Sequence, residues 1–196
     1  STSLRYIGNL FVEAIILPNL KFKSSFGIDY NNYDESEYWN TYLILGSPSG
    51  LATSSIGQYT TWINEQTLSY RKNVGARSSF GLLLGNTLQS SISSRTAAEG
   101  RGFANNSFTQ ISSAAITTSS QDWSKNTLTS FFARADYNQG GKYLVDFSIR
   151  ADASSRFGQD NQWGYFPAVG AAWRIKQEDF LKDTRIVSDL KLRTSY

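Results

Sequence analysis

The residues in this chain best suited to chemistry are two carboxylates and two guanidinium groups that lie close together in the sequence, Asp152 and Asp160 with Arg150 and Arg156. Paired carboxylates carry out glycoside hydrolysis, one as the acid and the other as the base or nucleophile. A polar loop held by arginine–aspartate pairs uses the same residue types and is much commoner. The sequence therefore predicts no enzyme here. It predicts a tight loop over 153–158 in which Arg156 reaches a carboxylate or a carbonyl.

Other kinds of chemistry are excluded because whole residue types are missing. The chain has no cysteine, methionine or histidine, so no thiol nucleophile, disulfide, haem or Cys/His zinc site can be built. We expect no cofactor and no metal. The net charge of +3 is dispersed and forms no nucleic-acid footprint. The mean hydropathy of −0.36 and the lack of a long uncharged apolar run exclude a bundle of membrane helices.

A glycine-containing segment, Glu99–Asn106, is a candidate for binding. Its glycines allow positive φ, and Phe103 could insert into a neighbouring surface beside Arg101. It lacks the spacing of a phosphate-binding loop. A contact with a substrate or a partner and a simple anchored loop both fit this segment.

Aromatic side chains in polar segments are the other binding candidates. They could stack on the flat apolar faces of sugar rings, or pack against one another, and they are Tyr33, Tyr38, Trp39, Tyr42 and Trp123. The nearby acidic run 34–37 lacks the fixed spacing of a calcium loop. We therefore expect that run to be solvated.

The elements that must position these residues are β-strands, because apolar and polar residues alternate with period two. The clearest case places Tyr143, Val145, Phe147 and Ile149 against Asp146, Ser148 and Arg150. In all we predict about eight strands, near 4–16, 20–30, 59–71, 77–89, 130–138, 143–152, 164–174 and from about 188. Tyrosine and tryptophan at strand ends suit a membrane interface.

The predicted connections alternate between short and long. Tight turns at 17–19, 71–75 and 138–141 separate long polar segments at about 31–58, 90–126 and 153–163. This order is typical of a barrel with short periplasmic turns and longer extracellular loops. After Trp173 we expect one short helical turn in an otherwise tight connection. The chain begins and ends in strand-like sequence, which suggests a piece of a larger domain.

Several motifs, in order along the chain, carry a resemblance to a known family. They are Asn19–Gly27, Arg101–Phe103, Ser130–Tyr137, Ser148–Gly158, Trp163–Ala168, Ala172–Ile175, Glu178–Leu181 and Asp189–Tyr196. With these motifs the chain resembles the barrel region of SusC/RagA-type TonB-dependent receptors of Bacteroidetes. The resemblance spans nearly the whole chain and is densest from about 128 onward.

The resemblance implies a large plugged barrel of the 22-stranded class in the cell outer membrane. Such a barrel imports oligosaccharides or peptides, is capped by a SusD-type surface lipoprotein and is opened by TonB. The plug domain and the TonB box are absent from 1–196, so we expect a barrel fragment that transports nothing alone. The family supplies no catalytic residues. The loop candidates for contact with substrate or lipoprotein are Tyr38, Trp39, Tyr42, Arg101, Phe103, Trp123 and Arg156.

Two other classes stay open, a soluble all-β carbohydrate-binding module and a structural or adhesive surface protein. The two faces of the sheet discriminate between them. In a barrel the apolar face contacts lipid and the polar face lines the lumen, whereas in a sandwich the apolar face is the core.

Three structural expectations follow from the barrel hypothesis. The strands should form one antiparallel meander in which each pairs with its neighbour in sequence. The three long connections should lie at one end, the extracellular one. One face should carry Val145, Phe147, Ile149, Phe80, Leu82 and Leu84, and the other Arg134, Asp136, Asp146 and Arg150.

Overall fold

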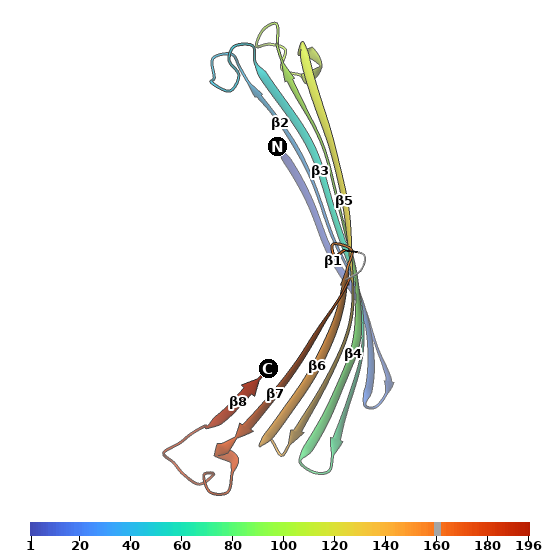
Figure 1. Cartoon of the computed structure of the whole chain (residues 1–196), viewed down its shortest axis with the longest axis vertical. Coiled ribbons are helices and arrows are strands. Elements are labelled where there is room, and N and C mark those ends of the chain that lie inside the picture. Colours follow the sequence, from blue (N-terminus) through green and yellow to red (C-terminus); the bar gives the residue numbers. More distant parts are fainter. Residues whose placement is uncertain (159–161) are drawn as a thin grey trace. The chain divides into compact units, whose positions relative to one another are not determined.

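The chain folds almost entirely into β-structure. The computed structural model describes residues 1–158 and 162–196. The strands in these residues are β1 (Thr2–Leu17), β2 (Leu20–Trp39), β3 (Leu51–Val74), β4 (Ser78–Arg101), β5 (Ile116–Gln139), β6 (Tyr143–Ser154), β7 (Trp163–Arg174) and β8 (Lys191–Ser195) (Figure 1). Two 3₁₀ turns, η1 (Ile111–Ser113) and η2 (Ile175–Gln177), interrupt the connections. Among the described residues, no helix has the length and apolar character needed to cross a membrane.

The strands form a single eight-stranded sheet in the order β1 to β8. Each strand therefore pairs with its neighbour in sequence, and the predicted antiparallel up-and-down meander is confirmed. The register of β6 illustrates the pairing, because Phe147 lies opposite Ala135 of β5 and Val169 of β7. Antiparallel neighbours need only short connections, which is why a meander suits this chain.

The residues group into two compact units. The first comprises 1–9, 27–62 and 90–126, and the second comprises 10–26, 63–89 and 127–196. The five long strands β1 to β5 contribute residues to both units. The two units are described separately below.

In the second unit the polar and apolar side chains occupy opposite faces, as predicted. Arg134 pairs with Ser148 and Asp136 with Asp146, and these pairs alternate with Ala133–Ile149 and Ala135–Phe147 along the β5–β6 ladder. A Cβ at Gly81 would meet the Asp136 carboxylate, so the odd residues of β4 face the polar side. The even residues Phe80, Leu82 and Leu84 therefore face the apolar side, where Leu84 shares a groove with Phe131 and Ile149.

Neither face carries an apolar core of the kind found in a soluble sandwich. Among the described residues, the buried hydrophobic side chains are Leu51, Ala52 and Phe103, all in the first unit. By contrast Phe131 is 52% exposed and Phe147 48% exposed. The sheet thus exposes its large apolar side chains rather than burying them.

The long connections are shorter than the sequence predicted. Among the described residues they occupy 40–50, 102–115, 155–158 and 162, because β2 to β5 extend well into the segments expected to be loops. These strand ends are rich in serine and threonine and lack apolar alternation. They pair through the backbone and through hydroxyl contacts such as Thr61 Oγ1 to Ser91 Oγ at 2.9 Å. Alternation was therefore the wrong signal for where these strands end.

Two reversals in the second unit differ in character. The β5–β6 turn is tight, with Gly140 and Gly141 at φ values of 60° and 70°, which glycine adopts without steric cost. The predicted helical turn after Trp173 is present as η2, but the connection 175–190 is long rather than tight. Within it, Lys176 Nζ donates hydrogen bonds to the carbonyls of Leu181 and Thr184, at 2.9 and 2.5 Å.

Candidate functional site

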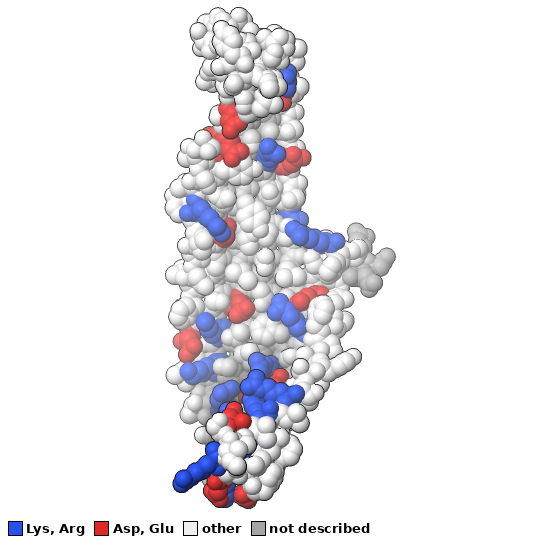
Figure 2. All heavy atoms as spheres, turned by 90° about the vertical axis from the view of Figure 1, so that its left-hand side faces the viewer, with Lys and Arg blue, Asp and Glu red and all other residues white. Residues whose placement is uncertain are grey.

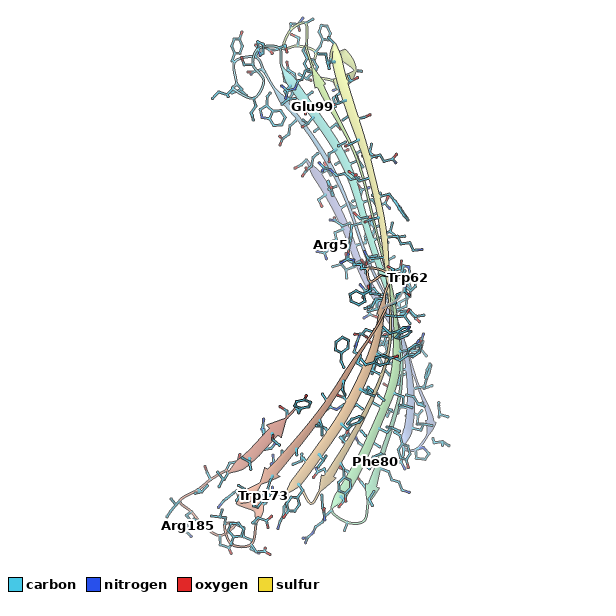
Figure 3. All side chains as sticks on the ribbon, viewed as in Figure 1. Arg5, Trp62, Phe80, Glu99, Trp173 and Arg185 are labelled. Atoms are coloured by element: carbon cyan, nitrogen blue, oxygen red, sulfur yellow. The ribbon has the colours of Figure 1, made fainter. Side chains whose placement is uncertain are left out.

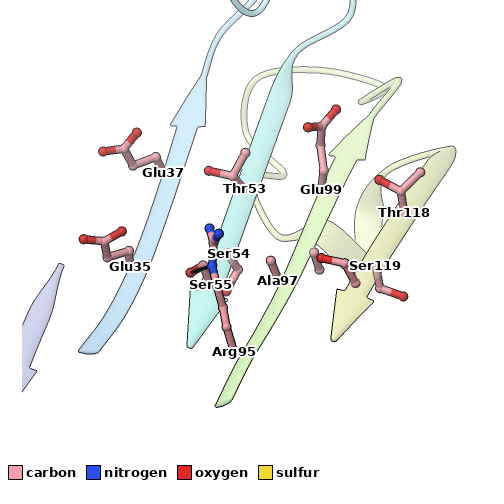
Figure 4. A pocket seen from close by; sticks show the side chains of 12 residues that line it. Glu35, Glu37, Thr53, Ser54, Ser55, Arg95, Ala97, Glu99, Thr118 and Ser119 are labelled. Atoms are coloured by element: carbon pink, nitrogen blue, oxygen red, sulfur yellow. Dashed lines mark hydrogen bonds between the residues drawn. The ribbon is translucent and has the colours of Figure 1, made fainter. Parts of the chain in front are cut away.

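The polar face of the first unit contains an open hollow of about 500 Å³. β2 contributes Glu35 and Glu37 to its lining, and β4 contributes Arg95 and Glu99. The hydroxyl and small residues that complete the lining are Thr53, Ser54, Ser55, Ala97, Ala98, Thr118, Ser119 and Ser120 (Figure 4). The strands position these side chains because alternate residues of neighbouring strands point to the same face.

The charges in this hollow are only partly satisfied within it. Arg95 Nε donates to Ser55 Oγ at 3.3 Å, and Glu99 accepts from Arg101 Nε at 2.8 Å. Glu35 and Glu37 form no ion pair or side-chain hydrogen bond within the described part of the chain. The hollow therefore offers carboxylates and hydroxyls to a polar ligand.

At the end of the same unit, the connections 40–50 and 102–115 are fastened to each other. Tyr38 donates its hydroxyl to Asn106 Oδ1 at 3.0 Å, and Asn106 also bonds the backbone and the hydroxyl of Thr41. The Tyr38 and Phe103 rings meet edge to face at 5.2 Å. Phe103 N–H donates to the Ser49 carbonyl at 2.8 Å. This confirms that two of the three long connections lie together at one end.

This loop end is almost without charge. Every residue of 40–50 and 102–115 is uncharged, and Figure 2 shows few coloured atoms there. Tyr42 is 88% and Ile44 96% exposed. Apolar side chains held out by an ordered loop are typical of surfaces that contact another molecule.

The structure corrects where several loop candidates lie. Tyr38 and Trp39 end β2, Arg101 ends β4 and Trp123 lies within β5, so these four are strand residues. They were expected in loops because the sequence around them is polar and lacks the apolar alternation that indicates a strand. Tyr42 alone of the aromatic candidates lies in a connection with an exposed ring, whereas the nearby Phe103 is a buried anchor.

In the charged cluster that suggested glycoside chemistry, hydrogen bonds from Arg150 hold the side chains in place. Arg150 Nε donates to Asp152 Oδ1 at 2.7 Å and its Nη2 to Ser130 Oγ at 3.0 Å. Arg150 also lies 5.9 Å from the Phe132 ring. Asp160 lies outside the described residues. Arg156 is exposed in the connection 155–162, with its backbone N–H bonded to Ser154.

A second hollow of about 710 Å³ lies on the polar face of the second unit. Lys21, Arg71 and Arg134 line it together with Asp136 and Asp146. Arg71 Nη2 lies 3.5 Å from both carboxylate oxygens of Asp136. Both polar faces thus carry charges of both signs, spread over the strands (Figure 2). Side chains project from both sides of the strands (Figure 3).

No pattern in the sequence indicated the network around Glu178 in the connection 175–190. Glu178 Oε1 accepts hydrogen bonds from Tyr143 Oη at 2.7 Å and Trp173 Nε1 at 3.0 Å. Its other oxygen lies 3.2 Å from Lys142 Nζ. These contacts hold the pKa of Glu178 below its usual range, and the hydrogen bond from Tyr143 has the largest effect. The network ties the connection to the turn ends of β6 and β7.

Comparison with known proteins gives the fold and the sequence a context. No family model matches the chain. The TonB-dependent receptor P3 of Formosa agariphila is 30% identical over 195 residues, covering 97% of this chain and 19% of the relative. The TonB-dependent receptor SusC of Bacteroides thetaiotaomicron is 32% identical over 195 residues, with the same coverage of 97% and 19%.

A solved structure of the RagAB peptide transporter shares the fold. It matches 98% of this chain and 22% of its own chain at a TM-score of 0.90 and 23% identity. With an unbroken meander and two chemically distinct faces, the chain belongs to the TonB-dependent receptors. Among them its sequence and fold are of the SusC/RagA type. The chain spans about a fifth of the length of the curated relatives it matches.

Proposed function

We propose that the chain forms part of the wall and outer loops of a TonB-dependent transporter in the outer membrane. The observation that carries this proposal is the two-faced sheet without an apolar core of its own. One face exposes Phe131 and Phe147 at 52% and 48%, while the other carries Arg134, Asp136 and Asp146. A strand wall between hydrocarbon and an aqueous lumen needs this division.

The transported substrate is an oligosaccharide or a peptide. RagAB, which shares the fold, is a peptide transporter, and this supports the peptide class. The oligosaccharide class rests on the resemblance of the sequence motifs to SusC/RagA-type receptors. The hollow with Glu35, Glu37 and Glu99 suits either substrate, since carboxylates accept hydrogen bonds from sugar hydroxyls and from peptide N–H or ammonium groups. Substrate would pass this hollow on its way through the lumen.

A SusD-type surface lipoprotein is the proposed partner at the loop end. The connections 40–50 and 102–115 are ordered, uncharged and apolar at Tyr42 and Ile44. An ordered apolar surface binds a protein partner with little loss of conformational entropy. TonB would act through parts of the receptor outside residues 1–196.

A soluble carbohydrate-binding module fits the structure less well. Such a module packs one sheet against another and buries its apolar face between them. Here the described residues form one sheet, and Phe131, Val145 and Phe147 remain exposed. In the proposed function, a membrane covers this apolar face.

Cysteine accessibility in the full-length receptor tests this proposal. The chain contains no cysteine, so Val145→Cys and Ser148→Cys place single thiols on the apolar and polar faces. A thiol in hydrocarbon does not ionise and reacts poorly with a maleimide, whereas a thiol facing water reacts. In outer-membrane vesicles we expect Ser148→Cys to be labelled and Val145→Cys to be protected until the protein is unfolded.

The matched outcomes separate the hypotheses. Equal labelling of both thiols in intact membranes would contradict a lipid-facing wall. Recovery of the receptor in the soluble fraction, with Val145→Cys protected there, would favour the soluble module instead.

A further inference from the structure

An apolar groove of about 350 Å³ crosses the exposed face of the second unit. Its side chains come from four neighbouring strands, Leu84 of β4, Phe131 and Ala133 of β5, Ile149 and Ala151 of β6, and Tyr165 of β7. None of these side chains carries a charge. The groove is therefore part of the surface that the proposed function places against the membrane.

The groove exists because small and large residues alternate across the strands. Ala151 lies directly between Phe131 and Tyr165 in one row of the sheet, and Ala133 lies opposite Ile149 in the next row. Phe131 and Tyr165 stand two strand spacings apart, about 9–10 Å. The two alanines make a floor, and the larger side chains make walls, so an extended hydrocarbon chain fits between them.

One end of the groove has the chemistry of a membrane interface. Trp163 begins β7 and stacks with Phe131, with ring centroids 6.2 Å apart and planes at 22°. Both rings are exposed, at 46% and 52%. Tryptophan and neighbouring aromatic rings favour the headgroup region of a bilayer. The groove thus begins at the level expected for lipid headgroups.

The connection between β6 and β7 contains a cation, Arg156, two residues after the end of β6. Arg156 is exposed, and within the described residues its guanidinium forms no ion pair or hydrogen bond, while its backbone N–H bonds Ser154. A guanidinium group binds phosphate through two parallel hydrogen bonds. In the proposed orientation, this connection lies on the extracellular side, next to the outer leaflet.

We propose that the groove and Arg156 together bind one phosphorylated, acylated lipid of the outer leaflet. An acyl chain lies over Ala151 and Ala133 between Phe131 and Tyr165, and the phosphate pairs with Arg156. The charge complementarity and the continuity with the lipid-facing surface favour a lipid over a protein segment as the occupant. The inference rests on the proposed function, which sets this face in the membrane.

The test measures lipid retained by the full-length receptor. Receptor extracted from outer membranes is stripped with detergent and incubated with lipid A, with dephosphorylated lipid A or with phosphatidylethanolamine, and bound lipid is counted by native mass spectrometry. We expect the two phosphorylated lipids, lipid A and phosphatidylethanolamine, to be retained in preference to dephosphorylated lipid A. Ala151→Phe fills the groove and should lower lipid A retention about tenfold. Val145→Phe adds the same ring to the same strand outside the groove and should leave retention unchanged.

The Arg156→Gln variant separates the contribution of the phosphate to binding from that of the acyl chain. This variant should bind lipid A and its dephosphorylated form equally, because only the phosphate contact is lost. Equal retention by wild type and Ala151→Phe, or retention of dephosphorylated lipid A by the wild type as strong as that of lipid A, would overturn the proposal. A change of oligomeric state in Ala151→Phe without loss of lipid would assign the groove to a protein neighbour and overturn it too. All these outcomes presuppose receptor recovered from the outer membrane, and its absence there would instead contradict the proposed function.

Discussion

Asp136 and Asp146 lie directly opposite each other on β5 and β6. Like charges in such a pair destabilise a sheet. Each carboxylate is accommodated beside a glycine of the next strand, Asp136 at Gly81 and Asp146 at Gly170. A Cβ built at Gly81 would stand 2.5 Å from Asp136 Oδ1, and one at Gly170 would stand 2.7 Å from Asp146 Oδ1. The glycines give the two acids room to turn away from each other.

Gly81→Ala should destabilise the receptor by about 1–3 kcal/mol, because the new methyl group displaces the Asp136 carboxylate. The displaced group then moves toward Asp146. The temperature at which the folded band is lost on electrophoresis measures the effect. Asp146→Asn in the Gly81→Ala background should recover part of the loss. Full additivity of the two changes would show that the carboxylates do not interact.

Glu178 should make stability depend on pH. Its folded pKa is lowered mainly by the hydrogen bond from Tyr143 and next by the one from Trp173; burial opposes them, and Lys142 lowers the pKa by a smaller amount. A lowered folded pKa adds stability above the unfolded pKa, and that stability is lost as the pH falls through the folded pKa. Thermal midpoints of wild type and Glu178→Gln should therefore differ near neutral pH and converge in acid.

The control for this experiment is Asp183→Asn in the same connection. Asp183 is exposed and makes no ion pair or side-chain hydrogen bond in the part of the chain that the structure describes. Its replacement should leave the midpoint unchanged at both pH values. A difference between wild type and Glu178→Gln that persists in acid would assign the effect to packing rather than to charge.

Asn106→Ala should loosen the loop end without unfolding the wall. The change leaves the Tyr38 hydroxyl and the Thr41 N–H without their partner, which costs about 1–3 kcal/mol locally. Limited proteolysis should then cut 40–50 or 102–115 sooner, and binding of the lipoprotein should weaken. Asn105→Ala removes a single local bond, to Ser107 N–H, and should change neither measurement.

Deleting part of the connection 102–115 should separate recognition from folding. Removal of 107–110, which leaves Asn106 and η1 in place, should impair substrate uptake or lipoprotein association while the receptor still inserts. Removal of the Gly140–Gly141 turn should instead lower the amount of folded receptor, because no other residues adopt its positive φ angles easily. Normal uptake and normal complex formation after the loop deletion would remove the reason for assigning this loop a role.

The wall was predictable from sequence where side chains alternate. The residues from Tyr143 to Ile149 have the predicted register and facing. The second half of β4 was not predictable. Its buried residues include the polar Ser90 and Ser91, and backbone hydrogen bonds to the neighbouring strands hold it in place. Periodicity of apolar residues cannot detect such a strand.

The anchors of the connections were missed for a different reason. Tyr38 and Asn106 are 68 positions apart in the sequence, and Tyr143 and Glu178 are 35 apart. No local pattern links such residues. Only the order of the strands brings them together. The hydrogen bond of Arg150 with Asp152 was expected because its members are two residues apart on one strand.

The small buried cluster of Leu51, Ala52 and Phe103 gives the loop end a temperature response of its own. Apolar burial from water weakens on cooling, whereas the backbone hydrogen bonds of the strands have no such dependence. Cooling should therefore loosen the apolar packing of these three side chains, whereas the hydrogen bonds of Asn106 and Phe103 should keep 40–50 joined to 102–115. A receptor of this kind would gain mobility at its loop end in the cold, while its strands stayed paired.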